Sequence, residues 1–437
     1  MEHCNKLLLL VFLVLTLATN SLAEHKWALY LYGLNGSDPT VAQMALYDWL
    51  RLRRSKPSDD VAVLGLRDLP FSDTRYYEVT EEGHNVVERR PTNENTGDPD
   101  NLFNFLTWAS DRAPAKKTWL LFDGHGTGAV VGGEPTLPED RDFIEGGPGF
   151  EGLVGPEPPS GGGLGPGGID RDLLTMGELD AVLKRIEGLE QVELMAFQAC
   201  QMQNLEALYE LRERARYFVG SEESMRNHPF PLTDLVRYLS EHPEADGSAF
   251  GRYFVEHSFA FSPRRIFTLS CVEASKLSSV AQAVSVLGRE LMSLPLWSLG
   301  EWEKEELKQL KELVACGKAA VAVGSGKYVD LSLLAKAIEE WATKHSKPNV
   351  AGAAVAVQSA VSEAVIITKS RKRYVGCGGV SVFFPTVDTP GFIRKLRGRP
   401  AYEPSELIAQ YGRTDFAQDT NWDEFIKVLA RTAWDRL

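Results

Sequence analysis

Short apolar runs alternate with amphipathic segments through the first half of the chain. The runs are rich in β-branched, aromatic and leucine side chains, and turn residues or polar residues bound them. The expected strands are 27–32, 61–66, 119–122, 192–197 and 217–220. The expected helices are 40–52, one opened by Asp98 and Pro99, 170–186 and 204–214. Strands that alternate with helices in this way predict an α/β fold with a mainly parallel central sheet flanked by helices.

The second half of the chain is richer in helical periodicity. Its expected helices are 276–294, 301–314, 330–345 and 422–437, and one strand is expected within 379–385. The change of pattern suggests a catalytic-type core over 24–265 and a helix-rich C-terminal part over 266–437 that contributes this strand.

The first 23 residues have the pattern of a signal peptide. Lys6 precedes an apolar run from Leu7 to Ala18, and Ser21 and Ala23 are small residues at the spacing that signal peptidase requires. The alternative is an uncleaved anchor, but the run is shorter than the roughly 20 apolar residues of a spanning helix. We therefore predict cleavage after Ala23, a secreted or extracytoplasmic protein, and no membrane association afterwards.

Charge and cysteine content narrow the classes of function. The 47 Lys and Arg residues against 60 Asp and Glu residues give a net charge of −13, which argues against nucleic acid as a partner. Removal of the signal leaves four cysteines, too few for a disulfide framework in a chain of this length. No Cys or His spacing predicts a metal site, and no cofactor motif is present.

A segment from 146 to 168 consists mostly of Gly and Pro. It has too few large apolar side chains to offset the entropy of ordering it, so we expect a surface loop. The flanking basic residues are Arg141 and Arg171, and no Lys or Arg lies between them.

Two expected strands end close to residues that can perform nucleophilic catalysis. His125 follows 119–122 between two glycines, and Cys200 follows 192–197. In parallel sheets, ligands bind beyond the carboxyl ends of the strands, so both side chains are expected at one crevice. A His beside a Cys favours the reactive thiolate, and the Gly126 amide is free to face an oxyanion. Taken singly, a Cys is more often a small buried residue and a His between glycines a turn residue; together they favour catalysis.

These residues also resemble a known family. The segments 123–128 (DGHGTG) and 196–202 (AFQACQM) resemble the histidine and cysteine motifs of the clostripain-like cysteine peptidases, peptidase family C11 of the caspase-like clan. Further similar segments are 219–222, 269–270, 328–330, 378–385 and 422–425. The resemblance implies a caspase-like fold and a Cys200/His125 dyad. It also implies an oxyanion hole formed by the amides of Gly126 and Cys200, and maturation by cleavage between His125 and Cys200. Some relatives use Ca²⁺.

Two features bear on what the resemblance implies. Arg141 and Arg171 are the processing candidates if cleavage requires a basic residue; the alternative is that the Gly/Pro segment is only a tolerated insertion. The family usually has Asp two residues before the Cys, where it holds a basic P1 side chain, and this chain has Gln198. An amide cannot form that ion pair, so Gln198, Ser221 and Glu222 become the candidate substrate-binding residues. A solvated loop acid is the alternative interpretation of Glu222.

The sequence thus predicts a secreted cysteine endopeptidase that hydrolyses peptide bonds through an acyl-enzyme, with proteins or peptides as substrates. The alternative is a catalytically silent secreted homologue that binds peptides or a protein partner.

Overall fold

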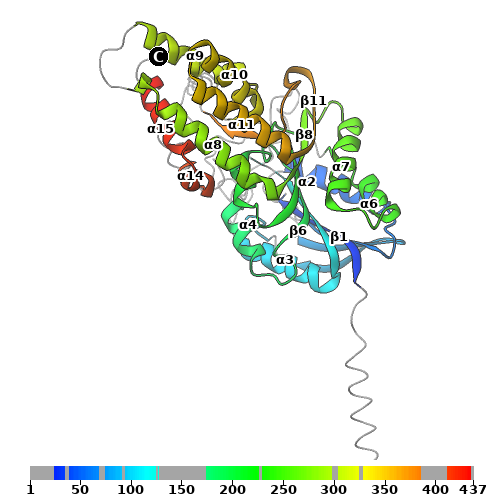
Figure 1. Cartoon of the computed structure of the whole chain (residues 1–437). Helices are drawn as coiled ribbons and strands as arrows, with labels where there is room; N and C mark the ends of the chain where they lie inside the picture. Colours follow the sequence, from blue (N-terminus) through cyan, green and yellow to red (C-terminus); the bar gives the residue numbers. More distant parts are fainter. Residues whose placement is uncertain are drawn as a thin grey trace, which may run out of the picture.

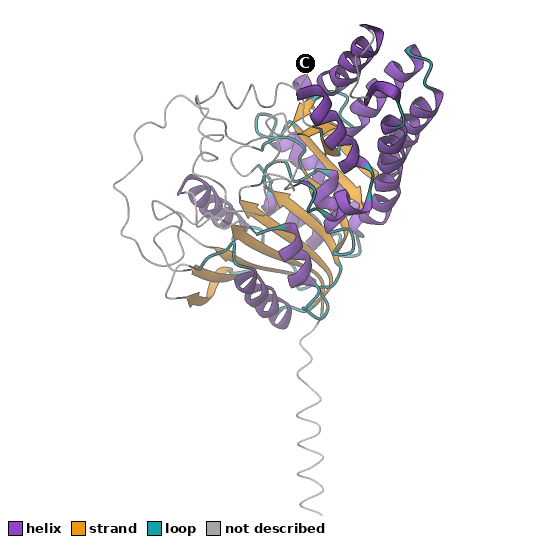
Figure 2. Cartoon of the chain, turned by 90° about the vertical axis from the view of Figure 1, so that its left-hand side faces the viewer, coloured by secondary structure: helices purple, strands orange, loops and turns teal. Residues whose placement is uncertain are grey.

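A nine-stranded sheet forms the centre of the molecule (Figures 1 and 2). The computed structural model describes residues 24–34, 39–67, 74–90, 94–124, 126, 174–225, 229–297, 304–323, 328–384 and 411–434. The strand order is β11-β8-β7-β6-β5-β1-β2-β3-β4. The five strands from β7 to β2 in this order are mutually parallel, and the outer strands pair in the antiparallel sense. The predicted α/β class with a parallel central sheet is confirmed.

The strands of this sheet come from the whole length of the chain. Their bounds are β1 His25–Leu34, β2 Val61–Arg67, β3 Thr74–Thr80, β4 Gly83–Arg90, β5 Ala115–Gly124, β6 Val192–Gln198, β7 Ala215–Gly220, β8 Thr268–Glu273 and β11 Val365–Ser370. β8 and β11 lie beyond residue 265 and belong to the same sheet as the strands before it.

Side chains alternate between two cores, one on each face of the sheet. In β1, Trp27, Leu29 and Leu31 belong to one core, and the intervening Tyr30 and Tyr32 belong to the other. Successive side chains of a strand point to opposite faces, so a strand covered on both faces is apolar throughout. This explains why β1, β5 and β6 are continuous apolar runs in the sequence.

Helices cover both faces of the sheet (Figure 1). On one face lie α2 Pro39–Leu52, α6 Leu232–Glu241 and α7 Gly247–Phe261. The core of the other face includes residues of α3 Pro99–Arg112, α4 Met176–Leu183, α5 Leu205–Glu210, α8 Leu277–Met292 and α11 Pro348–Ala364. Four further helices pack on these: α10 Leu331–Lys344 on α11, α9 Lys304–Ala319 on α10, α15 Trp422–Trp434 on α8 and α14 Asp415–Asp419 on α5. The described residues also include the short 3₁₀ helices η2 Ala274–Lys276, η3 Pro295–Trp297 and η5 Lys372–Tyr374.

A second, three-stranded antiparallel sheet joins the C-terminal part to the core. Its strands are β9 Ala322–Val323, β10 Tyr328–Asp330 and β12 Ser381–Phe383, in the order β12-β10-β9. The strand expected within 379–385 is therefore β12. The Ser381 amide donates to the Gln203 carbonyl oxygen at 3.0 Å, which places this sheet directly beside the segment that follows Cys200.

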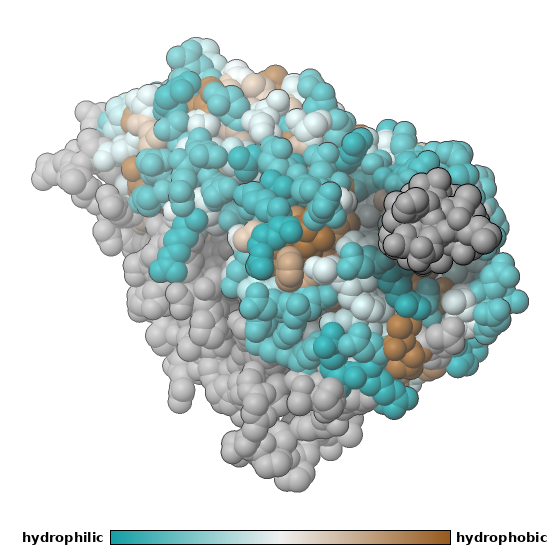
Figure 3. All heavy atoms as spheres, turned by 90° about the horizontal axis from the view of Figure 1, so that it is seen from below, coloured by the Kyte–Doolittle hydropathy of each residue, from teal (hydrophilic) through white to brown (hydrophobic). Residues whose placement is uncertain are grey.

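The surface is mainly polar where it can be seen. The face shown in Figure 3 is largely hydrophilic, with a few separate apolar groups. Among the described helices, none has the length and apolar character that crossing a bilayer would require.

Candidate active site

Cys200 lies immediately beyond the carboxyl end of β6, where the chain turns sharply. Gln201 has a φ of 62°, in the left-handed region that costs a non-glycine residue about 1–3 kcal/mol. The side chain of Asn204 holds the turn, because its amide nitrogen donates to the Gln201 carbonyl oxygen at 2.7 Å and its oxygen accepts from the Ala207 amide at the start of α5. Cys200 is left partly exposed at this strained turn.

The end of β5 meets Cys200 at very short range. Asp123 pairs with Gln198 in the parallel register of β5 and β6, and Gly126 lies against Cys200. A Cβ atom added at Gly126 would lie 2.4 Å from the Cys200 carbonyl oxygen and 2.9 Å from the Cys200 nitrogen. Only glycine fits there. The segments that follow β5 and β6 therefore meet at one edge of the sheet, as expected, at Gly126 and Cys200.

His125 itself lies outside the described residues, although its two neighbours in the chain, Gly124 and Gly126, are described. Arg141, Arg171 and the segment 146–168 also lie outside them, as do residues 1–23. The predictions for these residues stay predictions.

The backbone amides of Gly126 and Cys200 are candidates for an oxyanion hole. Neither amide has a hydrogen-bond acceptor among the residues that the structure describes. Donors that are not already paired are what a developing oxyanion requires.

The Cys200 thiol contacts the backbone of Met225 in the segment after β7. The Met225 amide donates to Sγ at 3.3 Å, and the thiol lies 3.5 Å from the Met225 carbonyl oxygen, to which it donates. Burial raises the pKa of Cys200 above the usual thiol range, the Met225 amide and Ser224 lower it, and Glu223 raises it. The helix after Cys200 does not offset the effect of burial, because α5 begins only at Leu205 and its N-terminus is capped by Asn204.

Gln198 is held inside the protein. Its amide nitrogen donates to Asp48 Oδ2 at 3.0 Å and to Asp123 Oδ1 at 2.9 Å, and its oxygen accepts from the Phe230 amide at 2.9 Å. All three polar side chains are buried, with exposures of 4% for Gln198, 3% for Asp48 and 1% for Asp123. One amide group thus bridges two carboxylates and is not available to a substrate in this arrangement.

Ser221 and Glu222, the two other candidate substrate-binding residues, are also buried. Ser221 is 0% exposed and shares a 2.9 Å hydrogen bond with the Thr268 hydroxyl. Glu222 is 1% exposed, and burial, followed by the nearby Asp330 carboxyl, raises its pKa well above the usual range. A substrate would have to displace these contacts to reach either side chain, so direct substrate contact is not supported, and the alternative of a solvated acid at Glu222 is wrong.

Sequence reasoning missed three participants in this site. Asp123 belongs to the histidine motif, and its position one residue before the end of a strand was a usable signal. Asp48 lies in α2, far away in the sequence, and Met225 contributes backbone atoms that no side-chain pattern reveals.

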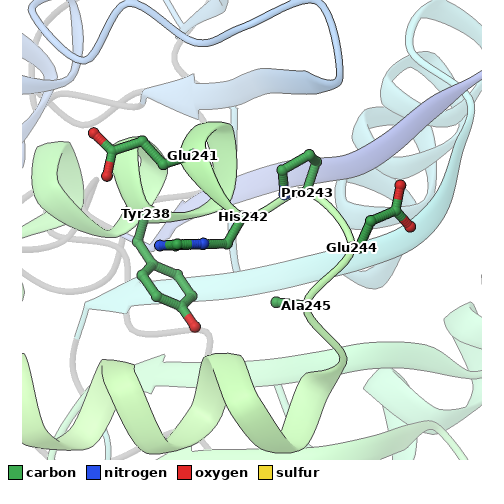
Figure 4. Close-up of a pocket in the computed structure, with 6 residues that line it drawn as sticks. All are labelled: Tyr238, Glu241, His242, Pro243, Glu244 and Ala245. Atoms are coloured by element: carbon green, nitrogen blue, oxygen red, sulfur yellow. The ribbon is translucent and has the colours of Figure 1, made fainter.

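A separate pocket of about 420 Å³ lies elsewhere, at the end of α6 (Figure 4). It is lined by Tyr238, Glu241, His242, Pro243, Glu244 and Ala245. The Ala245 carbonyl oxygen accepts from Trp27 Nε1 and Lys117 Nζ, near the starts of β1 and β5. Parallel strands begin at one edge and end at the other, so this pocket is at the opposite end of the sheet from Cys200. It contains no nucleophile placed for peptide hydrolysis.

Comparison with known proteins identifies the family. A model of the clostripain family, Peptidase C11, matches residues 168–428, which is more than half of the 437 residues. The chain belongs to the clostripain family. It is therefore a cysteine-type peptidase, and the matched range contains Cys200 but begins after His125. No curated protein sequence matches the chain.

Solved structures of C11 proteases share the fold of this clostripain-family chain. A secreted C11 cysteine protease from Bacteroides thetaiotaomicron, in complex with an irreversible peptide inhibitor, is 16% identical, with a TM-score of 0.60 over 93% of this chain and 99% of the solved one. An inactive zymogen C11 protease from Parabacteroides distasonis is 14% identical, with a TM-score of 0.59 over 91% and 99%. At these identities the likeness establishes the fold.

Proposed function

We propose that this protein is a secreted endopeptidase in which Cys200 is the nucleophile and His125 its acid/base partner. The observation that carries the proposal is the contact between Gly126 and Cys200. It brings the residue that follows His125 in the chain against the backbone of the nucleophile. A proton-transfer partner must come within hydrogen-bond reach of the thiol, and the chain position next to Gly126 makes His125 the candidate for this role.

The reaction runs through an acyl-enzyme. His125 accepts the Cys200 proton, and the thiolate attacks the scissile carbonyl carbon to form a C–S bond. The Gly126 and Cys200 amides hold the oxygen that becomes negatively charged. The tetrahedral intermediate collapses, the C–N bond breaks, and His125 gives its proton to the leaving amine. Water, deprotonated by His125, then cleaves the thioester and restores the thiol.

The charge that would select a basic P1 side chain does not come from Gln198. Its amide is paired with Asp48 and Asp123, so the position contributes no carboxylate to a substrate pocket. We propose peptides and proteins as substrates and assign no P1 preference to this position.

Activity is tested with the full chain and a mixed peptide library analysed by mass spectrometry. The wild type should cleave peptides and react at Cys200 with a thiol-reactive peptide probe, and Cys200→Ala should do neither. Cys316→Ala is the matched control, since it removes a buried thiol from α9 and should leave cleavage unchanged. Equal cleavage by Cys200→Ala would contradict the assignment. Absence of both cleavage and labelling in the wild type would favour the silent homologue that binds peptides.

We also propose processing between His125 and Cys200, at Arg141 or Arg171. Mass spectrometry of the purified chain should find a nicked form, and the double variant Arg141→Ala/Arg171→Ala should remain intact. Cys200→Ala should also remain intact if the enzyme processes itself. Nicking of Cys200→Ala at the same bonds would show that another peptidase is responsible.

Secretion is the remaining part of the proposal. Cleavage after Ala23 leaves β1 whole, because that strand begins at His25. N-terminal sequencing of the protein recovered outside the cell should start at Glu24. Retention in the cell with the first 23 residues attached would contradict it.

A further inference from the structure

Two carboxyl side chains and a thiol converge in the interior, next to the active-site segment but outside the catalytic machinery. Glu222 follows β7, Asp330 ends β10, and Cys377 lies between η5 and β12. Their ligand atoms all lie within 4.8 Å of one another. The residues are 1%, 0% and 4% exposed. Segments separated by more than 40 residues thus place two carboxyl groups and a thiol around one buried point.

Glu222 is buried without a well-formed hydrogen bond. Both of its carboxyl oxygens are inaccessible, and its polar neighbours in the described part of the chain are the Asp330 carboxyl and the Gly379 amide, neither of which makes a hydrogen bond of good geometry with it. Leaving a buried polar group unpaired costs about 1–3 kcal/mol, and more if it is charged. Its carboxyl group lies beside the Asp330 carboxyl and the Cys377 thiol, and no ion pair to it is found among the described residues, so a positive ion between the three groups would reduce this cost.

Asp330 is held in position as a metal ligand would be. Its two carboxyl oxygens accept from the Leu333 amide at 2.7 Å and from the Gly378 amide at 2.6 Å, and each oxygen keeps a lone pair. Hydrogen bonds of this kind orient ligating carboxylates. Gly378 directly follows Cys377, so the same contact that orients Asp330 also fixes the thiol.

We propose that Glu222, Asp330 and Cys377 bind one Zn²⁺ ion. The donor set decides the metal: Ca²⁺ and Mg²⁺ take oxygen ligands, whereas a thiolate with carboxylates in a small enclosed site suits Zn²⁺. Tetrahedral zinc holds its ligand atoms about 3.5 Å apart, given Zn–O and Zn–S distances near 2.1 and 2.3 Å. Small side-chain rotations bring the three groups to that spacing, and a water completes the tetrahedron. Binding displaces the Cys377 proton and any proton held by the Glu222 and Asp330 carboxyls, and the ion with three anionic ligands then carries a net charge of −1.

The ion would stabilise the segment that contacts the nucleophile. Glu222 lies three residues before Met225, whose backbone contacts the Cys200 thiol. The intervening Glu223 accepts from the Tyr374 hydroxyl at 2.7 Å, so two neighbouring contacts tie this segment to the loop that carries Cys377. We assign the ion a positioning role. This role rests on the proposed function of Cys200, whereas the proposal that zinc binds here does not.

Zinc binding is tested on the full chain in a Cys200→Ala background, which removes the partly exposed thiol and prevents self-cleavage. After dialysis against a chelator, the protein should take up one Zn²⁺ per chain, measured by elemental analysis, and its Tm should rise. Ca²⁺ at the same concentration should leave the Tm unchanged. Co²⁺ should give the thiolate charge-transfer absorption expected of a cysteine ligand.

Variants identify the ligands. Glu222→Gln and Cys377→Ser should each weaken zinc binding by more than about 100-fold, because outer-sphere partners alone contribute about 10–100-fold. Glu223→Gln, a neighbouring acid outside the cluster, and Cys316→Ser, a buried thiol elsewhere, should bind zinc as before. Circular dichroism confirms that each variant is folded.

Two results would overturn the proposal. A folded parent protein that takes up no zinc would mean that Glu222 and Asp330 instead share a proton. Zinc uptake that Glu222→Gln and Cys377→Ser do not weaken would place the ion elsewhere. Neither result affects the peptidase assignment, which is measured separately by cleavage and by labelling of Cys200.

Discussion

Gly126 and Cys200 touch through their backbones, at the ends of the neighbouring parallel strands β5 and β6. The space for a side chain at residue 126 is occupied by the Cys200 carbonyl oxygen, 2.4 Å from the position of a Cβ atom. A backbone contact of this kind fixes the two strand ends relative to each other. The nucleophile, the two candidate oxyanion donors and the chain position of His125 therefore form one unit whose geometry depends on the absence of a side chain.

Gly126→Ala should reduce peptidase activity strongly while the protein remains folded. The added methyl group must push the segment around residue 126 away from Cys200, and displacement of catalytic groups by about 1 Å can cost about 100-fold in rate. We expect a loss of kcat/KM of about 100-fold, measured with a peptide found in the library experiment.

Gly352→Ala is the matched control for this substitution. Gly352 is an exposed residue of α11, and no atom lies within 4 Å of its Cβ position. Alanine there should leave activity unchanged and stabilise the helix slightly. Wild-type activity in Gly126→Ala would show that the close contact is not needed for catalysis.

Gln198→Glu should destabilise the fold. The amide that bridges Asp48 and Asp123 would be replaced by a third carboxyl group, which cannot donate to either when ionised. Breaking a buried charged arrangement by removing one partner costs about 3–5 kcal/mol. Urea unfolding near neutral pH should show a loss of this size, and the loss should shrink at acidic pH, where the new carboxyl can stay protonated.

The control is Gln418→Glu in α14, where the side chain is exposed and its amide nitrogen donates to the Arg413 carbonyl oxygen. It should change the free energy of unfolding by no more than about 0.5 kcal/mol. Equal effects of the two substitutions would mean that the bridge at Gln198 is not important for stability.

Glu206 should make stability fall as pH rises from about 4.5 to about 7. Burial raises its pKa to about 7, although the Phe383 amide donates to Oε1 at 2.9 Å and lowers it in part. Between these pH values the folded state holds a proton that the unfolded state has released, so unfolding becomes more favourable with rising pH. The loss is complete above the folded pKa and amounts to roughly 3 kcal/mol.

Glu206→Gln should remove this component. The neighbouring Tyr411 hydroxyl stays protonated throughout, since burial raises its pKa well above the usual range. Free energies of unfolding measured by urea at pH 5 and pH 8 should differ less in Glu206→Gln than in the wild type. An unchanged difference would exclude Glu206 as the titrating group.

The parts of the fold that the sequence predicted are those with continuous local patterns. β5 and β6 are buried on both faces and appear as apolar runs, and the helix at α3 carries its cap at Asp98 followed by Pro99. The hairpin β3–β4 was missed because charged residues interrupt it at the edge of the sheet. β11 was missed because it directly follows the Ala- and Val-rich helix α11, and the boundary has no Gly or Pro.

The sequence predicted only the part of the site that lies at the ends of neighbouring strands. The meeting of β5 and β6 follows from their parallel order, so Gly126 and Cys200 could be paired in advance. The surroundings of Glu222 could not, because Asp330 and Cys377 lie more than 100 residues away in the chain. The same is true of Gln198, because its partner Asp48 lies in α2, far from Gln198 in the sequence.

The central claim is that His125 activates the Cys200 thiol, and the pH dependence of thiol labelling tests it most directly. The rate of inactivation by a thiol-reactive peptide should be measured from pH 5 to pH 10 for the wild type and for His125→Ala. The described surroundings raise the pKa of Cys200, so without the imidazole the rate should be low at neutral pH and keep rising toward alkaline pH. The wild type should already react at a plateau near neutral pH. Superimposable profiles for the two proteins would contradict the account.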